Sequence, residues 1–200
     1  MVMLIAVLGW KLAALYVVSG LAVAIVGGVL IGRMGLENQV EGYVYQTRMG
    51  TAEAAEMTWR ERIAYAWDDV KDIVSRIWIY VLIGIGVGAA IHGYAPADLL
   101  TRWAGPGNPL AVPIAVLLGI PLYSNAVGTI PVVQALLGKG VAVGTALAFM
   151  MSITALSFPE MIILRKVLKP RLIAIFIAVV GLAIIFTGYL FNAVGWRFLH

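Results

Sequence analysis

The stretch Gly119-Ile-Pro-Leu-Tyr-Ser-Asn-Ala-Val-Gly-Thr-Ile-Pro131 decides how the rest of the chain is interpreted. It carries two prolines, two glycines and four side chains that form hydrogen bonds, and it lies between the apolar segments 111–118 and 132–137. Neither flank is long enough to cross a bilayer, which takes about 20 helical residues. Pro121 and Pro131 lack an amide donor and clash with the preceding turn, so we interpret both as helix-breaking residues. Irregular backbone at membrane depth persists only where protein or a wet cavity satisfies it, which makes the stretch a candidate transport site.

Composition places the chain in a lipid bilayer. Of its 200 residues, 62% are hydrophobic and 12% are charged, whereas a soluble domain has about 45–50% apolar and about 25% charged residues. The chain has no cysteine and two histidines, which excludes thiolate metal sites and a multi-histidine site within one chain. The net charge of +4 comes without a dense basic run, so we expect no nucleic-acid partner. No catalytic residue set, metal site or cofactor site is visible, and we do not expect an enzyme.

Three segments are interpreted as full transmembrane helices: residues 4–31, 73–92 and 172–191. The first has neither a basic leader nor a small-residue cleavage site, so we expect a retained helix rather than a signal peptide. Its small residues recur every four positions, at Gly20, Ala24 and Gly28. This spacing is typical of a close helix-packing stripe, although glycine is also simply frequent in membrane helices.

Residues 58–76 have the pattern of an amphipathic helix. Apolar side chains recur at spacings of three and four, at Trp59, Ile63, Trp67, Val70, Val74 and Ile77. Such a helix lies in the plane of the membrane interface; the alternative is a cytoplasmic helix that binds a partner protein. We therefore divide the chain into an N-terminal transmembrane helix (1–32), a cytoplasmic linker with an amphipathic interfacial helix (33–72) and a third region (73–200).

The distribution of basic residues predicts the topology. If residues 110–138 form a re-entrant helical hairpin, ten Lys and Arg in 33–76 and 165–171 lie in the cytoplasm and four lie outside, which accounts for all 14. This agrees with the positive-inside rule. If the segment crossed fully, the basic cluster at 165–171 would face outwards. We therefore expect the hairpin, and copies of the chain that insert in a single orientation.

A second interruption, at residues 152–160, follows the first. Interrupted helices expose unpaired amides and carbonyls, and facing interruptions build a polar site within lipid. Asn125 is the strongest single candidate because its amide both donates and accepts, whereas Gln134 could instead bond between helices. The expected substrate-contacting residues are Tyr123, Ser124, Asn125, Gly128, Thr129, Gln134, Thr154, Ser157 and Glu160. The expected helix-breaking residues are Pro121, Pro131 and Pro159.

Two interpretations of Glu160 stay open. A carboxylate inside a membrane is by default a functional group, such as a proton or cation site. However, Ser157-Phe158-Pro159-Glu160 also matches a Ser-x-x-Glu capping box with proline in the first turn. In that arrangement Ser157 caps the helix and Glu160 accepts a hydrogen bond from the Ser157 amide.

The order and spacing of several fragments resemble a known family. The fragments are Ile91-His92-Gly93-Tyr94, Asn108-Pro109-Leu110-Ala111-Val112-Pro113, Gly119-Ile120-Pro121-Leu122-Tyr123, Gly128-Thr129-Ile130-Pro131, Lys139-Gly140 and Gly144-Thr145-Ala146-Leu147-Ala148-Phe149. Over roughly residues 67–191 they resemble the predicted-permease family that includes the ArsP-type organoarsenical efflux permeases.

Chains of that family usually have two related halves, each with a proline-flanked polar break. This chain resembles one half, mostly the second, with an added N-terminal span. The resemblance implies that residues 73–200 are a permease half-repeat and that two copies form a homodimer with an inverted-repeat architecture. Relatives often hold cysteine in the first break, where residues 124–127 read Ser-Asn-Ala-Val here. Transport through thiols is therefore not expected, and a small polar or anionic solute fits better.

The sequence thus predicts an all-α integral protein of the cell inner membrane, with about three full transmembrane helices, a re-entrant helical hairpin and a broken helix. The predicted function is a secondary-transporter-like permease that moves a small solute or ion across the bilayer without a cofactor. Two alternatives remain: a channel with the same re-entrant architecture, and a non-transporting structural subunit of a membrane complex.

Overall fold

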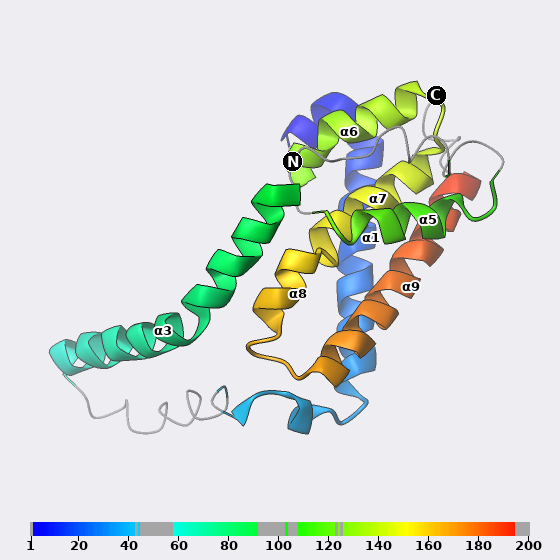
Figure 1. Cartoon of the computed structure of the whole chain (residues 1–200). Coiled ribbons are helices and arrows are strands. Elements are labelled where there is room, and N and C mark those ends of the chain that lie inside the picture. Colours follow the sequence, from blue (N-terminus) through cyan, green and yellow to red (C-terminus); the bar gives the residue numbers. More distant parts are fainter. Residues whose placement is uncertain are drawn as a thin grey trace.

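The computed structural model describes residues 2–42, 44, 58–91, 103, 108–122, 124 and 126–194, and within them the fold is all-α, as predicted. Figure 1 shows the arrangement of the helices. In chain order the elements are α1 (Val2–Gly32), the 3-10 helix η1 (Glu37–Gln39), α3 (Trp59–Ile91), α5 (Ala111–Gly119), α6 (Ala126–Gly138), α7 (Val143–Ala155), α8 (Phe158–Leu164) and α9 (Pro170–Val194).

Three segments of the described chain are helical, long and apolar enough to cross a membrane: Gly9–Gly32, Val143–Leu164 and Pro170–Val194. The first and third correspond to the terminal spans expected from the sequence. The second consists of α7 and α8 together, across the interruption between them. The expected span at 73–92 falls in the C-terminal half of α3, which is helical to Ile91; His92 lies outside the described residues.

The first helix bends at Gly9, where φ is +79° and ψ is 158°. A residue with a side chain rarely adopts this conformation, because its Cβ would be too close to the backbone. The turns before the bend therefore take a different direction and lie near α6 (Figure 1). As a result, the spanning part of α1 begins at Gly9 and not at Leu4.

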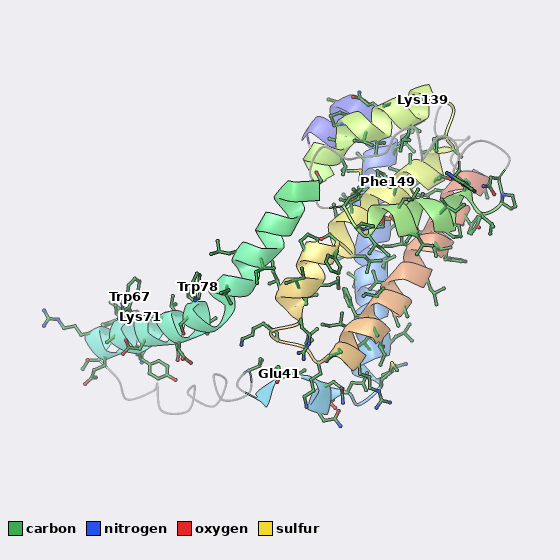
Figure 2. All side chains as sticks on the ribbon, in the orientation of Figure 1. Glu41, Trp67, Lys71, Trp78, Lys139 and Phe149 are labelled. Atoms are coloured by element: carbon green, nitrogen blue, oxygen red, sulfur yellow. The ribbon has the colours of Figure 1, made fainter. Side chains whose placement is uncertain are left out.

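α7 is the central helix, since it packs against α5, α6 and α9. Ten of its 13 residues, Gly144–Ile153, are buried. Phe149 lies at the centre of this core, in a cluster with Ala115 of α5 and Val133 of α6 (Figure 2). A helix that is apolar on every side is buried either in a protein core or in a bilayer. Here α5, α6 and α9 cover α7 and shield it from lipid.

The crossing of α7 and α9 depends on two glycines and an asparagine. A Cβ on Gly144 would overlap the carbonyl oxygen of Gly188 and lie 2.7 Å from Oδ1 of Asn192. That Oδ1 accepts the Thr145 N–H at 3.2 Å, while Nδ2 of Asn192 donates to Thr145 Oγ1 at 3.0 Å. Thr145 belongs to the first turn of α7, whose amides have no partner within the helix. The Asn192 side chain therefore caps α7 from another helix.

The small-residue stripe of α1 differs from the one expected. A Cβ on Gly27 would lie 3.7 Å from Val179 Cγ1 of α9, whereas a Cβ on Gly28 would meet nothing within 4 Å. A step of four residues turns a helix by about 400°, so a four-residue stripe drifts off a straight contact face. A step of seven turns it by about 700° and nearly returns to the same face, which places Gly20 and Gly27 together.

The segment after α1 closes one end of the bundle. We call residues 36–42 the strap. Val40 forms an antiparallel bridge with Leu168, the Glu41 N–H donates to Val167 O at 2.9 Å and the Lys169 N–H donates to Gln39 O at 2.8 Å. The strap therefore joins the end of α1 to the turn between α8 and α9 through main-chain bonds.

The two ends of the bundle carry different loops. Figure 2 shows Glu41 of the strap and Lys139 at opposite ends of the molecule. In Figure 1, α5 and α6 run in opposite directions, so the chain enters and leaves this pair on the same side. The combined span of α7 and α8 then returns to the strap end, where Arg165 pairs with Glu41. This is the arrangement that a re-entrant hairpin at 110–138 requires.

α3 extends away from the bundle and packs against α8 (Figure 1). The expected amphipathic segment continues into the expected spanning segment as one helix, and the helix bends between its halves (Figure 2). In the first half the tryptophans of the apolar stripe are exposed, Trp59 to 79%. Cations lie over two of these rings, Arg62 over Trp59 and Lys71 over Trp67, each at 5.7 Å from the centroid.

The first turn of α3 is expected to be sensitive to pH. The Glu61 carboxylate accepts the N–H and the hydroxyl of Thr58, both at 2.7 Å. The backbone bond, followed by the hydroxyl bond, holds the pKa of Glu61 below its ordinary value of 4.5. A carboxyl whose pKa is lowered by folding stabilises the structure above its unfolded pKa, and this stabilisation is lost as the pH falls through the lowered pKa. We therefore expect the turn to open more often in acid.

Amide hydrogen exchange in the full chain measures this opening. After correction for intrinsic rates, exchange at the start of α3 should be a few-fold faster at about pH 3 than at about pH 6. Glu61→Gln should remove the difference, whereas Asp68→Asn, a matched neutralisation on the same helix, should keep it. Equal protection of the wild-type turn at both pH values would contradict the expectation.

Candidate functional site

The interruptions of the two broken helices meet. α5 ends at Gly119, and the Ile120 carbonyl oxygen accepts the Phe158 N–H at 2.8 Å. Phe158 is the first residue of α8, where an amide has no partner within its own helix. The hydrogen bond thus joins the end of one interrupted helix to the restart of the other. We call this place the junction.

Gly119 and Ser152 bring α5 and α7 together beside the junction. A Cβ on Gly119 would overlap Oγ of Ser152 and lie 3.2 Å from the Phe149 carbonyl oxygen. Ser152 is fully buried, and its hydroxyl donates to that same carbonyl oxygen at 2.8 Å. Only glycine leaves room for this approach, so residue 119 fixes how closely the end of α5 can lie to α7.

Both interruptions are shorter than the sequence suggested. The first lies between the end of α5 at Gly119 and the start of α6 at Ala126, and the second is limited to Leu156 and Ser157. Pro121 lies in the turn after α5. Pro131 was predicted to break a helix, and this was wrong: it lies within α6. A proline in a membrane helix is tolerated where neighbouring groups satisfy the carbonyl that it leaves free.

The second interruption places Ser157 before α8 and Pro159 in its first turn. The capping box considered for this sequence does not form, since no side-chain hydrogen bond caps α8 at Ser157. Instead the Ser157 hydroxyl lies 3.5 Å from Oε2 of Glu160, at the outer limit of a hydrogen bond. Ser157 is 1% exposed and Glu160 is half-buried. These two polar side chains therefore face one another within the span.

The other predicted site residues fall into three groups. Tyr123 and Asn125 lie outside the described residues. Ser124 is half-buried in the first interruption, and Thr129 is 2% exposed in the first half of α6. Gly128 and Gln134 also lie on α6, at exposed positions. The polar groups that the structure places in or next to the interruptions are thus Ser124, Ser157 and Glu160, with Thr129 on the helix that follows.

Thr154 belongs to a different place. Its hydroxyl donates to the Met150 carbonyl oxygen at 3.0 Å and lies 3.5 Å from the Tyr16 hydroxyl of α1. Residues two apart on a helix point to nearly opposite sides, so Ser152 faces α5 and Thr154 faces α1. Thr154 lines a cavity of about 360 Å³ between α1, α7 and α9, together with apolar side chains such as Phe176.

Sequence reasoning missed two polar residues: Tyr16 lies in a segment interpreted simply as an apolar span, and Asn192 follows directly after the span expected at 172–191. The signal was present: Asn192 is an amide near the end of α9, and an amide there requires a partner. Its partner, Thr145, lies 47 positions away in the sequence. Among the described residues, no group of three or more His, Cys, Asp or Glu is placed to hold a metal ion.

Comparison with known proteins identifies the family. Residues 1–193 match the family ArsP_1, described as "Predicted permease". A segment of 113 residues is 27% identical to UPF0718 protein MJ0584 of Methanocaldococcus jannaschii. It covers 55% of this chain and 30% of that relative, so the chain spans less than a third of the relative's length. No solved structure matches the chain.

The family match is wider than the resemblance seen in the sequence, since it begins at residue 1. α1 is therefore part of the family's region and not an addition to it. Three membrane-length apolar helices and this match identify a multi-pass membrane protein of a transporter family rather than an enzyme family. The chain belongs to the ArsP_1 family of predicted permeases.

Proposed function

We propose that this permease moves a small polar or anionic solute past the junction. The observation that carries the proposal is the hydrogen bond between the Phe158 N–H and the Ile120 carbonyl oxygen, at 2.8 Å. It brings two helix interruptions into contact inside a bundle of apolar spans. Unpaired backbone groups are costly in the interior of a bilayer, and interrupted helices are maintained there where they form a polar site.

The side chains at the junction suit a polar solute. Ser124 and Ser157 offer hydroxyls that donate and accept, and Glu160 offers an acceptor. α6 begins immediately after the first interruption, so the positive end of its dipole favours an anion there. The proposed site comprises these groups with Tyr123, Asn125 and Thr129, as the sequence suggested. Thr154 is left out because it faces α1.

We further propose that the permease works as a homodimer in the cell inner membrane. The 113 matched residues are 30% of the relative, so the relative has about 113/0.30, or roughly 380, residues, about twice the 200 of this chain. This ratio supports two copies of the chain completing one transporter. A row of exposed apolar side chains on α9, at Leu182, Phe186 and Leu190, supports a contact with lipid or with a second copy.

Solute flux in proteoliposomes tests the proposed site. Vesicles containing the full chain are mixed with excess glycerol, urea or sodium acetate, and the rate of re-swelling reports solute entry. Ser124→Ala, Asn125→Ala and Ser157→Ala should each lower the flux of the solute that the wild type transports by about tenfold, the cost of one or two lost hydrogen bonds. Thr187→Val is the matched control, because its buried hydroxyl donates within its own helix α9, to Ala183 O at 2.8 Å.

The concentration dependence of the flux separates the alternatives. A carrier saturates with solute, whereas a channel of the same architecture does not. Flux that is unchanged in all three junction variants, in folded protein, would remove the junction from the pathway. Stoichiometric purification with another protein, together with no flux for any solute, would favour a structural subunit.

A further inference from the structure

A groove between α8 and α9 contains none of the polar side chains proposed for the transport site. Its volume is about 380 Å³. Each helix lines it with one face, at spacings of three and four residues: Phe158, Met161, Ile162 and Arg165 from α8, and Pro170, Ile173, Ala174 and Ile177 from α9. Because the short turn 165–169 joins the two helices, they run antiparallel and their apolar stripes face each other. Seven of the eight lining side chains are apolar.

Basic residues gather at the turn that closes one end of this groove, and one of them, Arg165, lines it. The turn and the start of α9 carry Arg165, Lys166, Lys169 and Arg171. Arg165 uses Nη1 for both of its bonds, to Glu41 Oε1 and to Leu168 O, each at 3.3 Å. Within the described ranges nothing is hydrogen-bonded to its Nη2 or Nε. Arg171 is exposed in the first turn of α9, where the helix dipole also favours negative charge.

The dimensions of the groove match one leaflet of a bilayer. The seven residues of α8 extend about 10 Å, at about 1.5 Å per residue, and half of the hydrocarbon core is about 15 Å thick. An acyl chain with its headgroup at the basic end would therefore lie along α8 without reaching the other leaflet. By the positive-inside rule, the leaflet at the basic end of the groove is the cytoplasmic one, where anionic lipids attract basic residues.

We propose that the groove binds one anionic phospholipid, with an acyl chain between α8 and α9 and the phosphate at Arg165 and Arg171. Charge selects this occupant: a zwitterionic lipid would bring no net negative charge to Arg165 and Arg171, and a free anion would leave the apolar lining uncovered. Glu41 pairs with one nitrogen of Arg165, and Arg171 is exposed at the start of α9. The inference does not depend on which solute is transported.

Native mass spectrometry of the full chain in detergent tests the proposal, with phosphatidylglycerol as the probe and phosphatidylcholine as the reference. The wild type should retain phosphatidylglycerol preferentially. Arg165→Gln should weaken this retention by about fivefold, as expected for the loss of one cation near the lipid surface. Ala174→Trp, which fills the groove and leaves every charge in place, should weaken it as well.

Two controls separate the groove from general charge effects. Glu41→Gln removes the same ion pair as Arg165→Gln but keeps the guanidinium, and Lys139→Gln removes a cation from the opposite end. Lys139→Gln should retain phosphatidylglycerol as the wild type does, and Glu41→Gln should retain it at least as well, because it removes a negative charge beside Arg165. The proposal would be overturned if the wild type retained the two lipids equally, or if Ala174→Trp retained phosphatidylglycerol as the wild type does. It would also be overturned if inorganic phosphate alone displaced the lipid. Loss of a dimer in Ala174→Trp would assign the groove to a second copy instead.

Discussion

Replacing Gly144 with alanine is expected to lower the free energy of unfolding by at least about 2–3 kcal/mol, the usual cost of overpacking a well-packed contact. The added methyl group would overlap the Gly188 carbonyl oxygen and lie 2.6 Å from the Asn192 amide nitrogen. Both are main-chain atoms, which cannot move aside as the end of a flexible side chain can. α9 would have to move away from α7, and the bonds between Asn192 and Thr145 would lengthen with it.

Thermal unfolding in detergent, followed by tryptophan fluorescence, measures this loss. Gly28→Ala is the matched control because its methyl group would meet nothing within 4 Å. In a helix, alanine is more favourable than glycine by about 1 kcal/mol, so this control should melt at or above the wild-type temperature. If the two variants melted at the same temperature, the close crossing of α7 and α9 would be disproved.

Gly119→Ala is expected to have the largest effect on transport. Its methyl group would collide with Oγ of Ser152 and displace the end of α5 from α7. The next residue supplies the carbonyl that bonds the Phe158 amide, so the junction would open. A displacement of about 1 Å at a site that positions a substrate can cost about a hundredfold in rate, and we expect a flux reduction of at least tenfold in proteoliposomes.

A second substitution distinguishes loss of the junction from general misfolding. Gly119→Ala combined with Ser152→Gly removes the atoms that would collide, and it should restore most of the flux. The two changes should therefore be strongly non-additive, as expected for residues in contact. Ser152→Gly alone should cost little flux, because it removes a hydroxyl bonded within its own helix. Additive losses would argue against the contact.

Much of this fold could be predicted from the composition and from the positions of the prolines and charged residues. A chain that is 62% hydrophobic and contains unbroken apolar runs must be membrane-embedded and helical, and Pro121 marked the end of α5. Charge counts also anticipated that Lys139 and the basic turn after α8 lie at opposite ends. These features depend on the local sequence and on the lipid environment, so they can be predicted without knowing how the helices cross.

Pairs that form only when helices cross could not be predicted. Gly119 meets Ser152, and Gly144 meets Asn192, across distant parts of the sequence. Periodicity shows which residues share a face but not which face meets which helix. The prediction that Pro131 breaks a helix was wrong for a related reason. A proline destabilises an isolated helix by about 3 kcal/mol, but packing against neighbouring helices decides whether the helix forms nevertheless. Thr154 was assigned to the wrong side because its opposite orientation to Ser152 matters only once α1 and α5 are placed.

The strap has a mechanical consequence. The main-chain bonds from Glu41 to Val167 and from Lys169 to Gln39 tie the end of α1 to the turn before α9. We therefore expect these two spans to move as one rigid unit, held together by the strap. Any rocking that exposes the proposed transport site alternately to the two aqueous phases is then expected in α5 and α6, and it would have to break the bond between the Ile120 carbonyl oxygen and the Phe158 N–H. The pivots of such a motion would be the segments at either end of the pair, around Asn108 and around Gly140, whose φ is +82°.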